Sequence, residues 1–300
     1  MSIEVSNLFK YYGEQAALLD VSFSVPGGQI TGFLGPNGAG KSTTMKIITG
    51  YISSSNGLVN VCGQEVDTEN LDIRKKIGYL PENNPLYTDL YVKEYLLFVA
   101  GMYKLKNKKE RVKEVISLVG LGLEQHKKIE SLSKGYRQRV GIAQAIIHDP
   151  EVLILDEPTS GLDPNQLDSI RKLIKSIGKE KTVLLSTHIM QEVEAICDRV
   201  IILNKGQIVA DRLSKDLQGS NKKQVIFLQF NKTTTRSQML KIKGVDSVSY
   251  HNDGWLLESD KEIEIRKNIN EFASKNGLVI NTLQLKKKTM EQFFKELTKN

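Results

Sequence analysis

The stretch at residues 35–43, GPNGAGKST, constrains the fold of this chain more than any other. It fits the phosphate-loop pattern G-x-x-x-x-G-K-[ST] in full. An apolar segment at residues 29–34 runs straight into it, and residues 43–49 have the composition of a helix. The sequence therefore predicts that the glycines lie where a strand passes into a helix, which is the context this pattern requires.

The residue types in this loop fit phosphate chemistry. Glycines at 35, 38 and 40 can take a positive φ and carry no Cβ, so successive N–H groups can surround a phosphate at the positive end of a helix. Lys41 supplies a charge for the β- and γ-phosphates, and the Ser42 hydroxyl supplies a ligand for Mg²⁺. A Gly-rich turn that binds nothing is the alternative. The residues expected to bind the nucleotide are Gly35, Asn37, Gly38, Ala39, Gly40, Lys41, Ser42 and Thr43.

An apolar run at residues 152–155 ends in two carboxylates, Asp156 and Glu157. Apolarity on both faces is typical of an interior strand in a parallel sheet, whose ligands lie beyond the carboxyl ends of the strands. Asp156 can hold Mg²⁺ through water, and Glu157 can polarise an attacking water. A purely structural role is the weaker alternative, because a buried and unpaired carboxylate pair is costly.

His188 follows a predicted strand at residues 182–187 and reaches the same edge of the sheet. A histidine that is merely satisfied by hydrogen bonds is the alternative to a catalytic one. Tyr12 precedes Gly13 in a predicted hairpin over residues 1–25, where it can stack on a purine ring or be an ordinary strand aromatic.

Ser133 begins the motif SKGYRQR and is predicted to cap a helix that continues through residues 140–147. A capping serine with a nearby glycine, here Gly135, can also hold a phosphate. Without further context, capping is the favoured interpretation. Asp163 and Pro164 are likewise predicted to be the N-cap and first residue of a helix.

The remaining pattern of the first two-thirds predicts strands at 57–61 and 76–80, a loop at 81–85, a helix at 189–197 and a hairpin that turns at 204–206. Two stripes have helical spacing: Tyr91, Tyr95, Phe98 and Met102, and Val112, Val115, Ile116 and Val119. Burial in the core is the favoured interpretation of both. The alternative for the region at 87–95 is a groove for a partner helix.

A polar stretch at 218–223 separates a second domain, so we expect domains at 1–217 and 222–300. The order expected beyond it is strand 225–230, helix 235–242, strands 245–250 and 255–259, helix 262–275 and strand 278–285. This β-α-β-β-α-β order is ferredoxin-like, and a terminal helix is expected at 289–297. No catalytic constellation occurs in this part of the sequence.

The net charge of +7 lies mostly in the second domain. Residues 1–219 carry 27 basic and 26 acidic side chains, whereas residues 220–300 carry 15 and 9. A basic domain can meet nucleic acid, anionic lipid or an acidic partner, and a solvated face is the bland alternative for the lysines at 286–288. No interleaved aromatics support nucleic-acid stacking.

No apolar run approaches the ~18 residues that would cross a bilayer. The N-terminus has neither a basic segment nor an apolar one, so no secretory signal is expected. The two cysteines, Cys62 and Cys197, form no disulfide framework or metal pattern, which suits a reducing compartment.

Taken in order, these motifs resemble those of the ATP-binding subunit of ABC transporters over residues 1 to about 215. Residues 35–42 resemble its phosphate loop, 132–136 its signature motif, 153–157 its second nucleotide motif, 160–163 its D-loop and His188 its switch histidine. The resemblance implies an α/β P-loop NTPase with a RecA-like core, an antiparallel β subdomain and a helical subdomain at about 88–150.

The resemblance also implies an ATP hydrolase that uses ATP and Mg²⁺, with Glu157, His188 and Lys41 as catalytic residues. Two copies are expected to meet head to tail around two ATP molecules, so that Ser133 and Gly135 contact the ATP held by the other copy. A separate permease is expected to contact residues 81–103 and to hold the subunit at the cytoplasmic face of the plasma membrane. No nucleic-acid partner is expected.

More narrowly, residues 78–87, 132–139 and 186–192 resemble the gliding-motility-associated subfamily of bacterial ABC ATPases. The C-terminal part is similar to the accessory domain of ATPases that serve exporter-like permeases. Two departures matter. Glu82, a candidate Mg²⁺ ligand, stands where most members have Gln, and the signature motif has Lys134 and Tyr136 in place of Gly and Gln.

Two rival functions remain. A soluble ABC ATPase that acts on a nucleic-acid or protein complex usually carries long coiled-coil insertions or two tandem cassettes, and this sequence has neither. A regulatory module that binds nucleotide without hydrolysing it is disfavoured because Lys41, Asp156, Glu157 and His188 are all present. Specificity for the cargo is expected to reside in the permease.

Overall fold

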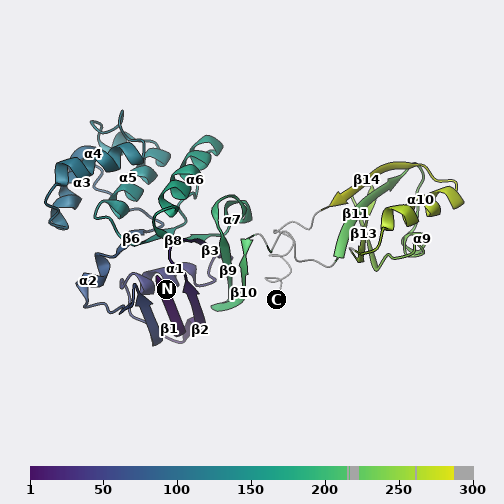
Figure 1. Cartoon of the computed structure of the whole chain (residues 1–300), viewed down its shortest axis with the longest axis horizontal. Coiled ribbons are helices and arrows are strands. Elements are labelled where there is room, and N and C mark those ends of the chain that lie inside the picture. The colour runs from purple at the N-terminus through teal and green to yellow at the C-terminus, as the bar shows by residue number, and fades with distance from the viewer. Residues whose placement is uncertain (215, 217–222, 261, 287–300) are drawn as a thin grey trace. The chain divides into compact units, whose positions relative to one another are not determined.

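A computed structural model describes residues 1–214, 216, 223–260 and 262–286. The chain divides into two compact units, Met1–Ser214 and Lys215–Asn300, whose elements are labelled in Figure 1. The first unit contains the α/β fold that the family resemblance implies, and the second contains a smaller α+β fold.

The first unit is built on a six-stranded sheet with the order β10-β9-β3-β8-β7-β6. Neighbouring strands are parallel except for the β9–β10 hairpin. Every residue of β3, β7 and β8 is buried, which explains why these strands read as apolar runs. The strands are β3 (Ile30–Leu34), β6 (Ile77–Leu80), β7 (Val152–Asp156), β8 (Thr182–Thr187), β9 (Arg199–Asn204) and β10 (Gln207–Leu213).

A second, antiparallel sheet has the order β2-β1-β4-β5 and contains the predicted N-terminal hairpin. Its strands are β1 (Ile3–Tyr12), β2 (Gln15–Val25), β4 (Asn56–Val61) and β5 (Gln64–Glu65). Helix α1 (Lys41–Ile48) begins inside the phosphate loop and shares one hydrophobic core with both sheets through Met45, Ile47 and Ile48. The loop is therefore fixed on a rigid base.

The helices of this unit are α2 (Leu71–Arg74), α3 (Val92–Met102), α4 (Lys108–Leu118), α5 (Lys134–Ile146), α6 (Pro164–Gly178) and α7 (Met190–Ile196), with a 3₁₀ turn η1 (Ile129–Ser131). Ser133 is the N-cap of α5, as predicted, so this helix begins at Lys134. Asp163 caps α6, with Pro164 as its first residue. Both predictions of capping are confirmed.

The prediction of core burial is confirmed for one of the two helical stripes and is wrong for most of the other. Val112, Val115, Ile116 and Val119 are buried as predicted. In the other stripe Tyr95 is buried, but Tyr91, Phe98 and Met102 are 44%, 47% and 68% exposed. The buried face of α3 is the adjacent stripe of Val92, Leu96 and Val99. Both stripes have helical spacing, and periodicity alone does not say which one faces the core.

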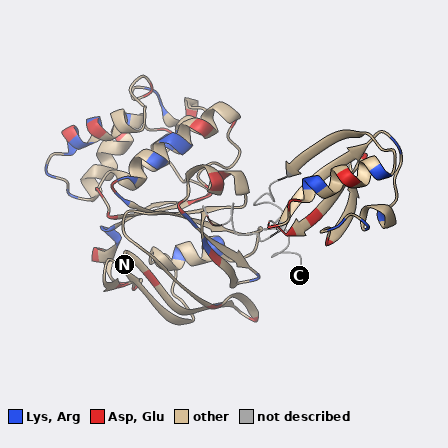
Figure 2. Cartoon of the chain, turned by 45° about the vertical axis from the view of Figure 1, so that its right-hand side comes forward, with Lys and Arg blue, Asp and Glu red and all other residues tan. Residues whose placement is uncertain are grey.

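The second unit forms a four-stranded antiparallel sheet with the order β12-β13-β11-β14 and two helices, which confirms the ferredoxin-like prediction. Its elements are β11 (Lys223–Phe230), α9 (Arg236–Met239), β12 (Ser247–His251), β13 (Gly254–Asp260), α10 (Ile265–Lys275) and β14 (Ile280–Lys286). Basic and acidic side chains are interspersed along α10 (Figure 2). The terminal helix expected at 289–297 lies outside the described residues.

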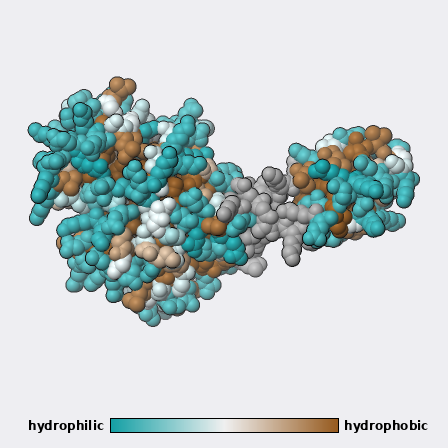
Figure 3. Space-filling model, in the orientation of Figure 1, coloured by the Kyte–Doolittle hydropathy of each residue, from teal (hydrophilic) through white to brown (hydrophobic). Residues whose placement is uncertain are grey.

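Within the described residues, no helix is both long enough and apolar enough to span a membrane. Figure 3 shows hydrophobic residues reaching the surface among hydrophilic ones in the region of α3, α4 and α5. The exposed stripe of α3 belongs to this region.

Candidate functional site

Four parallel strands bring candidate residues to one edge of the large sheet. The phosphate loop follows β3, Glu82 follows β6, Glu157 follows β7 and His188 follows β8. A cavity of about 550 Å³ lies at this edge. Its walls include Tyr12, Asn37, Gly38, Gly40, Lys41, Ser42, Thr43, Glu82, Glu157 and His188. Residues predicted from distant parts of the sequence therefore meet in one place.

The glycines of the phosphate loop have two different functions. Gly38 and Gly40 have φ values of 79° and 105°, in the region that favours glycine. Gly35 does not need a positive φ, contrary to expectation; a Cβ there would lie 2.4 Å from the carbonyl oxygen of Leu203. Gly35 thus lets the loop approach β9, and Ala39, which is buried, anchors it.

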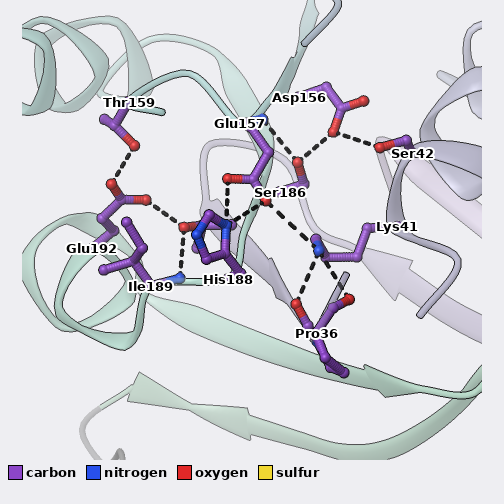
Figure 4. Close-up of polar contacts among 12 residues, drawn as sticks. Pro36, Lys41, Ser42, Asp156, Glu157, Thr159, Ser186, His188, Ile189 and Glu192 are labelled. Carbon is purple, nitrogen blue, oxygen red and sulfur yellow. Dashed lines mark hydrogen bonds and ion pairs between the residues drawn. The ribbon is translucent and has the colours of Figure 1, made fainter. Parts of the chain in front are cut away.

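Lys41 is held within the loop that it serves. It is 6% exposed, and its Nζ donates to the carbonyl oxygens of Gly35 at 2.9 Å and Pro36 at 3.3 Å (Figure 4). Its Nζ also lies 3.6 Å from Oε1 of Glu157. The ammonium is therefore positioned at the mouth of the loop, between the backbone that would surround a phosphate and the carboxylate at the end of β7.

Ser42 and Asp156 form a polar pair beside the loop. The Ser42 hydroxyl donates to Oδ1 of Asp156 at 3.1 Å, and the Ser186 hydroxyl also donates to that oxygen (Figure 4). No group of three or more His, Cys, Asp or Glu side chains within the described ranges could hold a metal. One hydroxyl and one carboxylate nevertheless fit Mg²⁺, which proteins commonly bind with one or two carboxylates plus substrate phosphates.

Glu157 is held in a specific and strained geometry. Its φ of 50° lies in the left-handed region, a conformation that costs about 1–3 kcal/mol for a residue other than glycine. It is 7% exposed, its N–H donates to the Ser186 hydroxyl at 2.9 Å, and its carboxylate lies 3.0 Å from Nδ1 of His188. A carboxylate that is shielded from water and oriented by a histidine can take a proton from a nearby water.

Tyr12 and Glu82 line the same cavity from its outer side. Tyr12 is 50% exposed, and the Nζ of Lys10 lies 5.3 Å from the centre of its ring. Glu82 is exposed. Beneath Glu82, the hydroxyl of Tyr79 is buried, and burial together with the nearby Asp156 carboxylate raises the pKa of this hydroxyl. Tyr79 therefore stays neutral near Asp156.

Ser133 and Gly135 do not join these residues. They line a separate cavity of about 400 Å³ with Asp163 and Gln166. The exposed Ser133 accepts from the N–H of Tyr136 at 3.4 Å and from Nε2 of Gln166 at 3.5 Å. Within one chain, the signature motif is therefore separate from the cavity of the phosphate loop.

The structure also places polar residues at the site that sequence reasoning missed. Ser186 links Asp156 to the backbone of Glu157. Glu192, on α7, is 1% exposed and accepts hydrogen bonds from the hydroxyls of Thr159 and Thr187. One feature of the sequence could have indicated the burial of Glu192. This carboxylate lies three residues after Ile189, on the same helical stripe as the apolar Val193 and Ile196.

Comparison with known proteins yields consistent matches. The family model described as ABC transporter matches residues 18–160. The ABC transporter ATP-binding protein YhcH of Bacillus subtilis is 42% identical over 216 residues, which cover 71% of this chain and 70% of that protein. The bacitracin transport ATP-binding protein BcrA of Bacillus licheniformis is 32% identical over 98% of this chain and 96% of its own length.

Solved structures agree with the fold. The dimeric ATP-binding cassette MJ0796, in a post-hydrolysis state bound to ADP and Pi, has a TM-score of 0.64 and 26% sequence identity. The match covers 71% of this chain and 98% of that one. A second structure, an ATP-binding subunit of an ABC transporter, has a TM-score of 0.66 and 31% identity over 73% of this chain and 93% of its own length.

Proposed function

The chain belongs to the ABC transporter family as an ATP-binding subunit that hydrolyses ATP, and from this premise we propose that it dimerises around two ATP molecules to drive a separate, exporter-type permease. The observation that carries the proposal is the division of the site within one chain. Lys41 and Glu157 line one cavity, whereas Ser133 and Gly135 line another. A second copy, placed head to tail, would bring the two halves together.

In the proposed reaction, Glu157 accepts a proton from the water that attacks the γ-phosphate. His188 orients the Glu157 carboxylate, and Lys41 offsets the negative charge that develops on the phosphate oxygens. The N–H groups of the phosphate loop hold the β-phosphate, and Tyr12 stacks on the purine ring. Ser42 and Asp156, with Glu82 nearby, would hold Mg²⁺, which neutralises phosphate charge when bound.

Binding and hydrolysis of ATP would close and open the proposed dimer. Ser133 and Gly135 of one copy would contact the γ-phosphate held by Lys41 of the other. ATP then favours the closed dimer because it binds both copies at once, and hydrolysis removes that bridge. The capped N-terminus of α5 is suited to this contact, since a helix N-terminus attracts anions.

The permease contact is proposed at residues 81–103. A groove of about 490 Å³ is lined there by Pro81, Glu82, Asn83, Pro85, Val99 and Tyr103. The same groove reaches Ser42 and Asp156, so a helix seated in it would adjoin the proposed Mg²⁺ ligands. The exposed side chains of Phe98 and Met102 on α3 provide apolar surface nearby.

The proposed location is the cytoplasmic face of the plasma membrane, through the permease. Relatives named for bacitracin transport and linearmycin resistance support an exporter-type partner.

A function in gliding motility is the narrower proposal, supported by the motifs at 78–87, 132–139 and 186–192. Salt-resistant copurification with a multispanning membrane protein is expected, and copurification with ribosomes or DNA instead would favour a soluble, non-transport ATPase.

The direct test of the proposed chemistry is Glu157→Gln, which keeps the shape of the side chain and removes the base. We expect ATP to bind with unchanged affinity, hydrolysis to fall at least about 100-fold, and a dimer to accumulate with ATP. Turnover and size-exclusion elution with ATP measure both effects. Glu194→Gln, an exposed change on α7, serves as the control. Near-normal hydrolysis by Glu157→Gln would refute the assignment.

A further inference from the structure

Glu192 is a buried carboxylate with two hydroxyl donors. It lies in the first turn of α7 and is 1% exposed. The Thr159 hydroxyl donates to its Oε1 (Figure 4), and the Thr187 hydroxyl donates to its Oε2. Thr187 Oγ1 in turn accepts from the N–H of Ile189 at 3.0 Å. Removing a carboxylate from water is costly, so these bonds must compensate for that burial.

The two threonines flank the residues proposed to act on ATP. Thr159 lies two positions after Glu157, and Thr187 directly precedes His188. The turn at residues 157–160 is closed by a backbone hydrogen bond, in which the N–H of Ser160 donates to the carbonyl oxygen of Glu157 at 3.2 Å. Glu192 therefore joins the backbone that carries Glu157 to the backbone that carries His188.

This link supports a geometry that would otherwise relax. Glu157 has a left-handed φ of 50°, and its carboxylate lies 3.0 and 3.1 Å from Nδ1 of the half-exposed His188. Ser186 holds the backbone of Glu157 on one side. Glu192 holds the following loop on the other, so the loop is fixed at two points.

We propose that Glu192 is a positioning residue for ATP hydrolysis, which sets the spacing of Glu157 and His188 by bridging Thr159 and Thr187. The inference rests on the proposed roles of Glu157 and His188. Glu192 does not line the cavity of the phosphate loop, so it acts through the two threonines. The backbone carbonyl oxygen of Thr159 also accepts from the N–H of Leu162 at 3.3 Å, which extends the link into residues 160–163.

The test measures kcat and KM for ATP with the full-length protein at saturating Mg²⁺. For Glu192→Ala we expect kcat to fall about 10- to 100-fold, because a small misplacement of catalytic groups is costly, while KM changes less than about twofold. Glu192→Gln keeps one acceptor and is expected to lie between this variant and the wild type. Glu194→Gln, exposed on the same helix, is expected to match the wild type.

A second set of variants separates positioning from general destabilisation. Thr159→Ser and Thr187→Ser keep the hydroxyls and should retain wild-type kcat, whereas Thr159→Val and Thr187→Val should lower it. In the Thr159→Val/Thr187→Val background, Glu192→Gln should lower kcat by less than about twofold further, since the bridge is already broken. All rates are taken at a temperature where thermal unfolding shows each variant to be folded.

Three results would overturn the proposal: wild-type kcat in Glu192→Ala, a rise in KM that matches the fall in kcat, or the full effect of Glu192→Gln in the double-valine background. Glu157→Gln, assayed in parallel, keeps the two claims apart. If Glu157→Gln is inactive and Glu192→Ala is normal, only the positioning role of Glu192 fails. If Glu157→Gln hydrolyses ATP normally, the proposed catalytic base fails first.

Discussion

The two ends of the proposed composite site differ in how fully one chain prepares them. At the phosphate-loop edge, Lys41 and Glu157 are 6% and 7% exposed and are linked to each other, to His188 and to the loop backbone. At the signature end, the exposed Ser133 makes hydrogen bonds of 3.4 and 3.5 Å, at the long limit of such contacts. The phosphate-loop end is preorganised, whereas the signature end presents a weakly bonded hydroxyl group to solvent.

This difference indicates that the two ends contribute to different steps, ATP binding at one and hydrolysis at the other. In the proposed model, ATP binding depends on a loop that is already in place within the chain. Hydrolysis in that model depends on the signature motif of a second copy, because Ser133 and the phosphate loop of one chain line separate cavities. Removal of Lys41 should therefore weaken ATP binding as well as turnover, whereas removal of the Ser133 hydroxyl should lower turnover and leave binding nearly unchanged.

The largest effect is expected from Lys41→Ala at the preorganised end. Loss of a charge-assisted contact to phosphate should weaken ATP binding about 10- to 100-fold, in the monomer and the dimer alike, and should abolish measurable turnover. Titration with a fluorescent ATP analogue measures the binding. Lys172→Ala, exposed on α6, is the matched control. Unchanged binding would remove Lys41 from the phosphate site and break the comparison.

A smaller and different effect is expected from Ser133→Ala at the signature end. ATP binding by the monomer should stay within about twofold, while hydrolysis at high protein concentration should fall about tenfold. Loss of the N-cap of α5 should also lower the free energy of unfolding by about 1 kcal/mol. Ser117→Ala, an exposed change on α4, controls for serine removal. If ATP binding by the monomer falls as much in Ser133→Ala as in Lys41→Ala, the signature end also contributes to ATP binding within one chain, and the proposed difference between the two ends is wrong.

The smallest effect concerns the packing behind the preorganised end. His148 donates from Nε2 to the carbonyl oxygen of Ile77 on β6 at 3.1 Å and stacks on Tyr103. Burial lowers the pKa of His148 to about 4, from an ordinary value near 6.5. The unfolded chain therefore binds more protons between these values, so stability falls as the pH drops from about 6.5 towards 4.

At about pH 5 this histidine should cost about 2 kcal/mol of stability relative to about pH 7. Urea unfolding followed by circular dichroism measures the difference. His148→Gln keeps a donor for the carbonyl oxygen of Ile77 and does not titrate, so its loss of stability over the same range should be smaller by that amount. Equal pH dependence in both proteins would mean that His148 is already accessible to protons.

Sequence alone could predict that the candidate residues lie at the ends of the strands, because simple physical rules place them there. The segments at 29–34, 152–155 and 182–187 predict strands, and parallel strands deliver the phosphate loop, Glu157 and His188 to one edge. The α/β class of the first unit was implied by the family resemblance, and the ferredoxin-like order of the second unit was predictable from apolar periodicity and turn residues.

Other features could not be predicted from pattern. Two neighbouring stripes on α3 have the same spacing, so only packing against α4 and α5 decides that Leu96 is buried while Phe98 is exposed. Thr159, Thr187 and Glu192 lie far apart or in different elements, and no motif announces that their side chains meet. The distance between Ser133 and the phosphate loop is likewise set by the fold and not by spacing along the chain.

The central claim, that catalysis requires a second chain, is tested most directly by mixing two inactive variants. Ser133→Arg keeps an intact phosphate loop, and Lys41→Ala keeps an intact signature motif. In an equal mixture, random pairing makes about half of the dimers mixed, each with one complete site, so ATP hydrolysis should recover to at most roughly a quarter of the wild-type rate. A mixture no more active than its separate components, or wild-type turnover by Ser133→Arg alone, would contradict the claim.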